Sequence, residues 1–221
     1  MPNQPFTYDT ETELSAVNSI LAAIGQSPVT RIFNNDKKEL SFVNPEVSFA
    51  YHLLQEVNTD VQNEGWCFNR EEHYELKPDG NQEFKIPDNV LRMDVSYGQI
   101  WRTTDVVRRD GKLYDKLHHT DKFTRPMCFD MVWKFAYEDL PSVFKRYITL
   151  RASGRAATQM VANPELVQLL GTQEAQARAA CVEYEANQGD YTFFGTPPGT
   201  GYNSFQPWNA LNRGYGGMGI Y

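Results

Sequence analysis

The fold is decided by residues 44–69, which read NPEVSFAYHLLQEVNTDVQNEGWCFN. Asn44 can cap the first turn of a helix, and Pro45 suits the first helical position because its missing N–H has no acceptor there. Gly65 suits the position just past a helix, where a left-handed backbone is common. The segment therefore predicts one long helix that ends at Gly65.

This helix is expected to be half buried. Apolar side chains recur every three or four residues along one face, and polar side chains occupy the other face. The apolar stripe consists of Val47, Ala50, Leu53, Leu54, Val57 and Val61. We interpret it as an interfacial helix that needs a partner on one side only.

A shorter helix is predicted upstream of it. Thr10 stands three residues before Glu13, the spacing of a capping box. Gly25 and Pro28 are expected to end this helix. Its buried face would contain Leu14, Val17, Ile20, Leu21 and Ile24.

From Trp66 onward the period changes to that of strands. Alternation around Tyr74 and Leu76, followed by the turn residues 79–81, predicts a hairpin whose second strand contains Phe84 and Ile86. Further alternation follows over residues 91–95. The middle third of the chain is therefore predicted to be antiparallel sheet.

Two further signals complete this β region. Asp110-Gly111 predicts a type I′ turn between strands at residues 105–107 and 112–114. The last strand is expected to place one apolar and aromatic set on a single face. That set is Met127, Phe129, Met131, Trp133 and Phe135.

Helical patterning returns after residue 138. Asp139 is the predicted N-cap of a third helix that runs to about Val161, and residues 163–165 repeat the Asn-Pro-Glu start signal for a fourth. Gly171 is a place where the fourth helix could bend or break. The expected core stripe of this helix is Leu166, Leu170, Ala177, Cys181 and Tyr184.

These elements predict an α+β fold. Residues 1–65 and 139–190 would form the two halves of a four-helix bundle, with residues 66–138 as an inserted antiparallel β region of hairpins. Residues 191–221 would form an extended C-terminal arm. The arm holds seven Gly between residues 195 and 219, and its only charged residue is Arg213.

The arm is interpreted as a partner-binding segment. A Gly-rich backbone loses much entropy on ordering, so the arm should order only where another surface receives its aromatic side chains. Those side chains are Tyr202, Phe205, Trp208, Tyr215 and Tyr221. A disordered chain end remains the alternative.

Five segments of this chain resemble tail tubular protein A, the head-to-tail adaptor of short-tailed podovirus-type bacteriophages. Each motif alone is common, but their order and spacing along one chain are specific. The segments are residues 14–29, residues 44–69, residues 86–94 (IPDNVLRMD), residues 109–116 (RDGKLYDK) and residues 137–157 (YEDLPSVFKRYITLRASGRAA). The resemblance that they carry extends over nearly the whole chain except the last thirty or so residues.

The resemblance implies a structural virion protein and not an enzyme. It implies a homo-dodecamer ring that links the portal protein to the nozzle (tail tubular protein B) and to the tail fibre, with genomic DNA passing through the channel without specific binding. It also implies a place in the virion tail, after assembly in the host cytoplasm. No cofactor and no metal is expected.

Composition agrees with a globular protein that does not bind nucleic acid tightly. The 221 residues are 41% hydrophobic, and the net charge is −7 with a pI near 5.1. Such a balance disfavours phosphate binding, which needs clustered Lys and Arg. No window approaches the roughly 18 apolar residues of a membrane span, so no membrane partner is expected. Three scattered cysteines form neither a disulfide framework nor a metal motif.

Two arginines interrupt the apolar face of the third helix. Arg151 and Arg155 lie one turn apart on the side of Phe144 and Tyr147. A buried cation needs a partner, and the alternatives are a salt bridge inside the protomer, one across a subunit interface, or side chains that extend to solvent. Candidate partners are Glu56, Glu64, Glu174, Glu183 and Glu185.

The sequence gives little support for a catalytic site. His118 and His119 are adjacent, so both are not expected to bind one metal ion, and Cys67 is interpreted as a structural thiol. The main alternative function is a tail-associated glycan hydrolase that uses paired carboxylates. Nominal pairs occur among Glu71, Glu72 and Glu75, and at Glu138 and Asp139.

Overall fold

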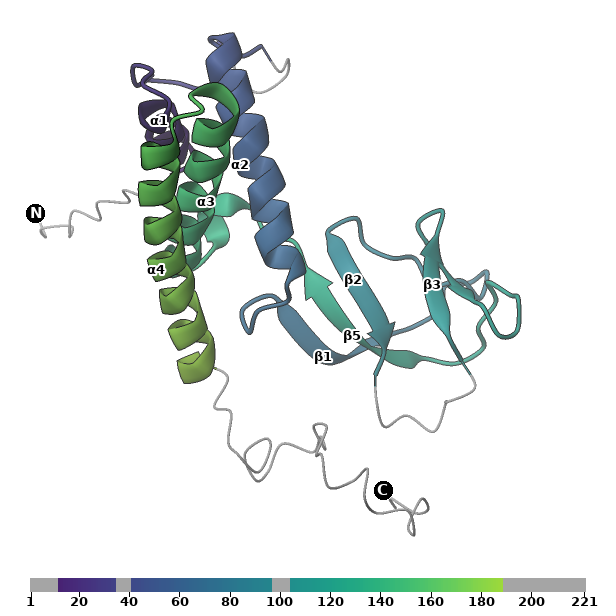
Figure 1. Cartoon of the computed structure of the whole chain (residues 1–221). Coiled ribbons are helices and arrows are strands. Elements are labelled where there is room, and N and C mark those ends of the chain that lie inside the picture. The colour runs from purple at the N-terminus through teal and green to yellow at the C-terminus, as the bar shows by residue number, and fades with distance from the viewer. Residues whose placement is uncertain (1–11, 35–40, 97–103, 189–221) are drawn as a thin grey trace, which may run out of the picture.

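A computed structural model describes residues 12–34, 41–96 and 104–188 of the chain. Within these residues the fold is α+β, with four α-helices and two small antiparallel sheets, which confirms the predicted class (Figure 1). The helices are α1 (Glu13–Ala23), α2 (Pro45–Asn63), α3 (Ser142–Met160) and α4 (Pro164–Gln188). The strands are β1 (Arg70–Leu76), β2 (Val90–Val95), β3 (Val106–Arg109), β4 (Lys112–Asp115) and β5 (Met127–Trp133).

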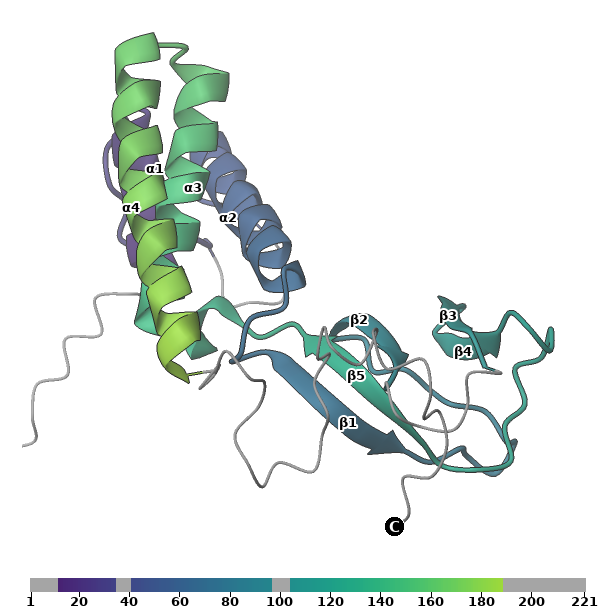
Figure 2. The same ribbon diagram turned by 60° about the horizontal axis from the view of Figure 1, so that its bottom comes forward.

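The helices gather at one end of the molecule, and the sheets extend from the other (Figure 2). Helix α3 packs against α1, α2 and α4. The first apolar core lies among these helices and includes Trp66, while a second core lies in the β region around Phe84 and Phe129. All six residues of the predicted α2 stripe are buried, which confirms its orientation.

The helix ends follow the sequence signals with two corrections. Thr12 caps α1 by accepting a hydrogen bond from the Ser15 N–H at 3.2 Å, so the predicted capping box was misplaced, and Thr10 itself lies outside the described residues. Asp139 is not an N-cap, because it ends a short 3-10 helix (Tyr137–Asp139), and α3 begins after Pro141. Helix α4 is continuous through Gly171.

One predicted hairpin is wrong. Strand β1 pairs with β5 in a sheet of order β1-β5-β2, and the segment with Phe84 meets β4 instead through a bridge between Lys85 and Lys112. The turn itself exists, because Asp79 and Glu83 are joined by a backbone hydrogen bond of 2.8 Å. The turn residues 79–81 predicted the position of the bend correctly, but they could not specify which strand would pair with β1.

The second hairpin is confirmed. Strands β3 and β4 pair across Asp110 and Gly111, whose φ angles of 49° and 74° are both positive, as a type I′ turn requires. In β5 the expected alternation ends early, because Val132 is buried and Trp133 is only partly buried. Phe135 packs with the helical core and not with the sheet core.

The two parts of the fold meet closely at the end of α2. Gly65 has a φ of +81°, which ends the helix and favours glycine. A Cβ at this position would lie 3.0 Å from the Arg92 guanidinium and 3.2 Å from Val132. A larger residue would therefore strain the turn and would require the Arg92 and Val132 side chains to shift.

Candidate functional site

The predicted cations of α3 lie on a polar seam between α2, α3 and α4. Arg151 Nη1 is 3.4 Å from Glu64 Oε1, and Arg151 Nε is 3.8 Å from Glu174 Oε1. Arg155 bonds to two α2 carboxylates, at 3.2 Å to Glu56 and 2.8 Å to Asp60. Both arginines therefore have ion-pair partners inside the protomer.

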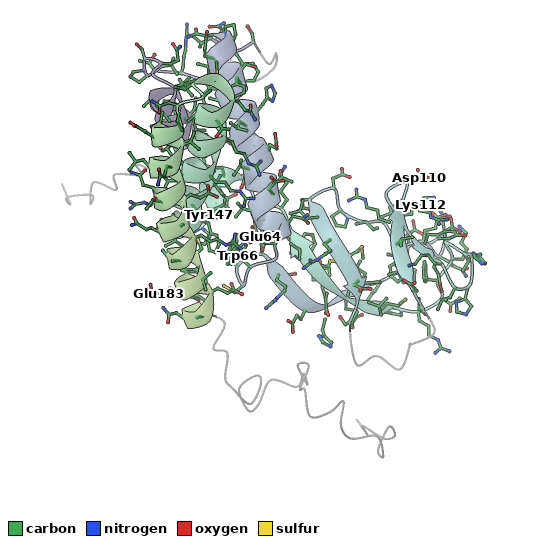
Figure 3. All side chains as sticks on the ribbon, viewed as in Figure 1. Glu64, Trp66, Asp110, Lys112, Tyr147 and Glu183 are labelled. Carbon is green, nitrogen blue, oxygen red and sulfur yellow. The ribbon has the colours of Figure 1, made fainter. Side chains whose placement is uncertain are left out.

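Arg178 on α4 completes this seam, and sequence reasoning missed it. It donates to Glu64 at 3.2 and 3.0 Å and to the Tyr147 hydroxyl at 2.9 Å. Arg151 also donates to that hydroxyl, at 3.0 Å, and the Tyr147 side chain is buried. Figure 3 shows Glu64, Trp66 and Tyr147 close together at this junction.

The electrostatics of the seam favour the charged form of Arg178. The hydrogen bond to Glu64, followed by that to Tyr147, raises the pKa of Arg178 above its already high usual value. The Arg178 guanidinium also lies 6.0 Å from the centre of the Trp66 ring, within the range of a cation–π contact. The sequence held one signal for Arg178, because this residue directly follows Ala177 of the expected core stripe of the fourth helix, at the edge of the buried face.

Glu183 lies apart from this seam. It is exposed near the lower end of α4 (Figure 3), and among the described residues it forms no ion pair. Glu185, two residues further along, contacts the rest of the protomer instead: its carboxylate accepts a hydrogen bond from the Cys67 N–H at 2.7 Å. The predicted arm residues Tyr202, Phe205, Trp208, Tyr215 and Tyr221 lie outside the described residues.

The outer side of α4 is a second surface of interest. Of its 25 residues only Leu170, Ala177 and Cys181 are buried. Small or apolar side chains recur on the outer side with the 3-4-3-4 spacing of a helix-packing seam. We call this set the α4 outer seam: Thr172, Ala175, Ala179, Val182 and Ala186, all exposed.

The far end of the β region holds two charged clusters. Asp115 is 3% exposed, and its carboxylate accepts from the ring of His118 at 2.7 Å and from the N–H of Leu117 at 2.8 Å. Burial alone raises the pKa of Asp115, but these bonds outweigh it and leave that pKa below its usual value. The pair orders a loop, and a cavity of about 320 Å³ lies beside it.

The second cluster is an ion-pair triad. Glu83 is 8% exposed and lies 2.7 Å from Lys112 Nζ and 2.6 Å from Lys122 Nζ. The hydrogen bonds from Lys112 and then Lys122 lower the pKa of Glu83. The triad joins the turn after β1, strand β4 and the loop before β5.

The other sequence candidates do not converge on a catalytic arrangement. Glu71 accepts from the Trp133 ring N–H at 3.0 Å, and Glu75 lies 3.6 Å from Lys77. Across residues 12–34, 41–96 and 104–188 no three His, Cys, Asp or Glu side chains are grouped as metal ligands. No helix in those ranges has the length and apolar character needed to cross a bilayer.

Within the described residues the structure is a packed α+β protomer that leaves most of α4 exposed. In a comparison with known families, residues 14–191 match the family described as tail tubular protein. The chain belongs to the tail tubular protein family and is a structural component of the bacteriophage virion tail, where it assembles with other tail components. No curated protein matches the chain.

Proposed function

We propose that this protein forms a closed adaptor ring in a short phage tail, between the portal protein on one side and the nozzle and tail fibre on the other. The family match supports a tail role, and the resemblance to tail tubular protein A supplies the finer one. The resemblance implies about twelve copies that meet head to tail, and a heterologous contact of this kind makes a ring when it closes.

The observation that carries the proposal is the α4 outer seam. This 25-residue helix packs against α3 but buries only three of its residues in its own protomer, so most of its surface is left exposed. Its exposed alanines would let a second helix approach closely, and Val182, which is 52% exposed, would be covered. We therefore assign the seam to the contact with a neighbouring copy.

The helices, the β region and the C-terminal arm would make different contacts in the tail. The helices, as a four-helix bundle built from both ends of the chain, would supply the contacts between copies and face the portal. The β region would face the nozzle and fibre, and the arm of residues 191–221 would bind a neighbouring copy. A net charge of −7 would let DNA slide through the channel without tight binding.

The test compares two matched variants. Ala179→Glu places a charge in the seam, whereas Ala136→Glu makes the same change at an exposed alanine away from α4. Light scattering and negative-stain imaging, with and without the portal protein, should show rings for the natural chain and Ala136→Glu but not for Ala179→Glu. A natural chain that stays monomeric and does not bind the portal would contradict the proposal.

A further inference from the structure

A groove on the opposite side of α3 from the polar seam is left uncovered. Its upper part is lined by α1, α3 and α4 and has a volume of about 400 Å³, and its lower part is lined by α3 and α4 alone and has a volume of about 460 Å³. The two parts share Arg146, Leu150 and Gln173, so they form one continuous surface.

The groove exists because α1 is short. Helix α1 has 11 residues and spans about 16 Å, whereas α3 has 19 residues and spans about 28 Å. Figure 1 shows α1 at the upper end of the helices, and α1 packs against α3 and α2. The lower groove therefore continues the line of α1 beyond its first residue, Glu13, and residues 1–11 of the chain join α1 at that point.

The residues that line the lower groove favour an occupant that is both apolar and acidic. Val143, Leu150 and Ala177 supply apolar surface, while Gln173 and Gln176 stand at the rim. Arg146 is exposed, and among the described residues it has no ion-pair partner, unlike Arg151 and Arg155 on the same helix. A carboxylate placed beside Arg146 would complete the charge pattern.

Residues 1–11 read MPNQPFTYDTE and carry this combination. Phe6 and Tyr8 offer aromatic surface, and Asp9 and Glu11 offer carboxylates. In extended form residues 6–11 span about 20 Å, which is enough to run from Thr12 along the lower groove. We propose that residues 1–11 bind in the lower groove of their own protomer, with the aromatic side chains on its apolar floor and a carboxylate on Arg146.

Disulfide trapping in the full-length chain tests this placement. Tyr8→Cys is combined with Gln176→Cys at the groove rim, or with Ala175→Cys, its neighbour on the α4 outer seam, as the matched control. After mild oxidation, peptide mapping by mass spectrometry should find the intramolecular disulfide at least ten times more often with Gln176→Cys. Equal yields in the two chains would overturn the proposal.

The charge pattern supplies a second test. Arg146→Glu should lower the trapping yield several-fold, Arg146→Gln should lower it less, and Asp9→Arg with Glu11→Arg should restore it in the Arg146→Glu chain. Circular dichroism checks that each variant keeps its helices. A yield that does not change with any of these charges contradicts the proposed pairing.

Other occupants would give distinct products. Covalent dimers joined through Tyr8→Cys and Gln176→Cys would show that the segment of a second copy fills the groove. A disulfide from Phe205→Cys to Gln176→Cys, with none from Tyr8→Cys, would assign the groove to the C-terminal arm. Either result would overturn binding within the protomer, and both can be read without any ring forming.

Discussion

The side chain of Gln62 holds the backbone of Phe135 as a neighbouring strand would. Gln62 Nε2 donates to the Phe135 carbonyl at 3.0 Å, and Gln62 Oε1 accepts from the Phe135 N–H at 2.7 Å. Gln62 is fully buried on α2, and Phe135 follows the end of β5. One side-chain amide therefore joins the helices to the sheet.

Removing this amide should weaken the whole protomer. Gln62→Leu keeps the approximate size but leaves the N–H and C=O of Phe135 without their partner, at a cost of about 2–4 kcal/mol in the free energy of unfolding. Urea denaturation followed by tryptophan fluorescence measures it. The exposed neighbour Asn63→Leu is the control and should change stability by less than about 0.5 kcal/mol. Equal effects would refute the bridging role.

The sequence predicted the helices well because their signals are local. The α2 stripe, the start at Pro45 and the stop at Gly65 all depend on residues within a few turns of each other. The type I′ turn at Asp110 and Gly111 is local in the same sense. Each of these features could be assigned from spacing and backbone preference alone.

Features that depend on distant pairing could not be predicted. β1 and β5 are about 60 residues apart, and periodicity cannot specify which strand lies next to which. The same holds for the polar seam, where Glu64 and Arg178 are 114 residues apart. Candidate partners for Arg151 and Arg155 could be named because carboxylates recur on α2. The position of the Tyr147 hydroxyl between Arg151 and Arg178 could not be predicted, because it depends on how α3 packs against α4.

Arg178 should determine how firmly α4 is held. Arg178→Met keeps much of the aliphatic length but removes the hydrogen bonds to Glu64 and Tyr147. Because the Arg178 side chain is 47% exposed, solvent screens the pair, and we expect a global loss of only about 1 kcal/mol. Hydrogen exchange should show faster opening of the lower half of α4.

The matched control for Arg178 is Glu183→Met. Glu183 is exposed on the same helix and makes no ion pair within the described residues, so its replacement should leave the exchange rates of α4 unchanged. If both variants accelerate exchange equally, the seam does not fasten the helix.

The Glu83 triad should make the β region sensitive to acid. The pKa of Glu83 is lowered in the folded state, so its stabilising contribution is complete above the usual carboxylate pKa and is lost as the pH falls through the lower folded value. The pKa values of Lys112 and Lys122 are raised, chiefly by hydrogen bonding to Glu83, so their contribution is lost only as the pH rises through those raised values.

NMR spectra of the β region recorded between pH 2 and pH 7 test the Glu83 prediction. The natural chain should lose dispersion of the β4 amide signals in acid, whereas Glu83→Gln should be less stable at neutral pH and should lose the acid dependence that comes from this group. Glu72→Gln, at an exposed carboxylate on β1, is the control. An unchanged acid profile in Glu83→Gln would contradict the assignment.

Cys67 should react slowly with alkylating reagents, and Glu185 is part of the reason. Burial, followed by the hydrogen bond and charge of Glu185, raises the pKa of the Cys67 thiol to about 11. At pH 8 only about one thiol in a thousand is then ionised, and the thiolate is the reactive form. Glu185→Gln should lower this pKa and increase the iodoacetamide rate at Cys67 several-fold, as read by mass spectrometry of the Cys67 peptide. Glu183→Gln leaves the thiol environment intact and should not change that rate, so an equal increase in both variants would show a general loosening of α4 instead.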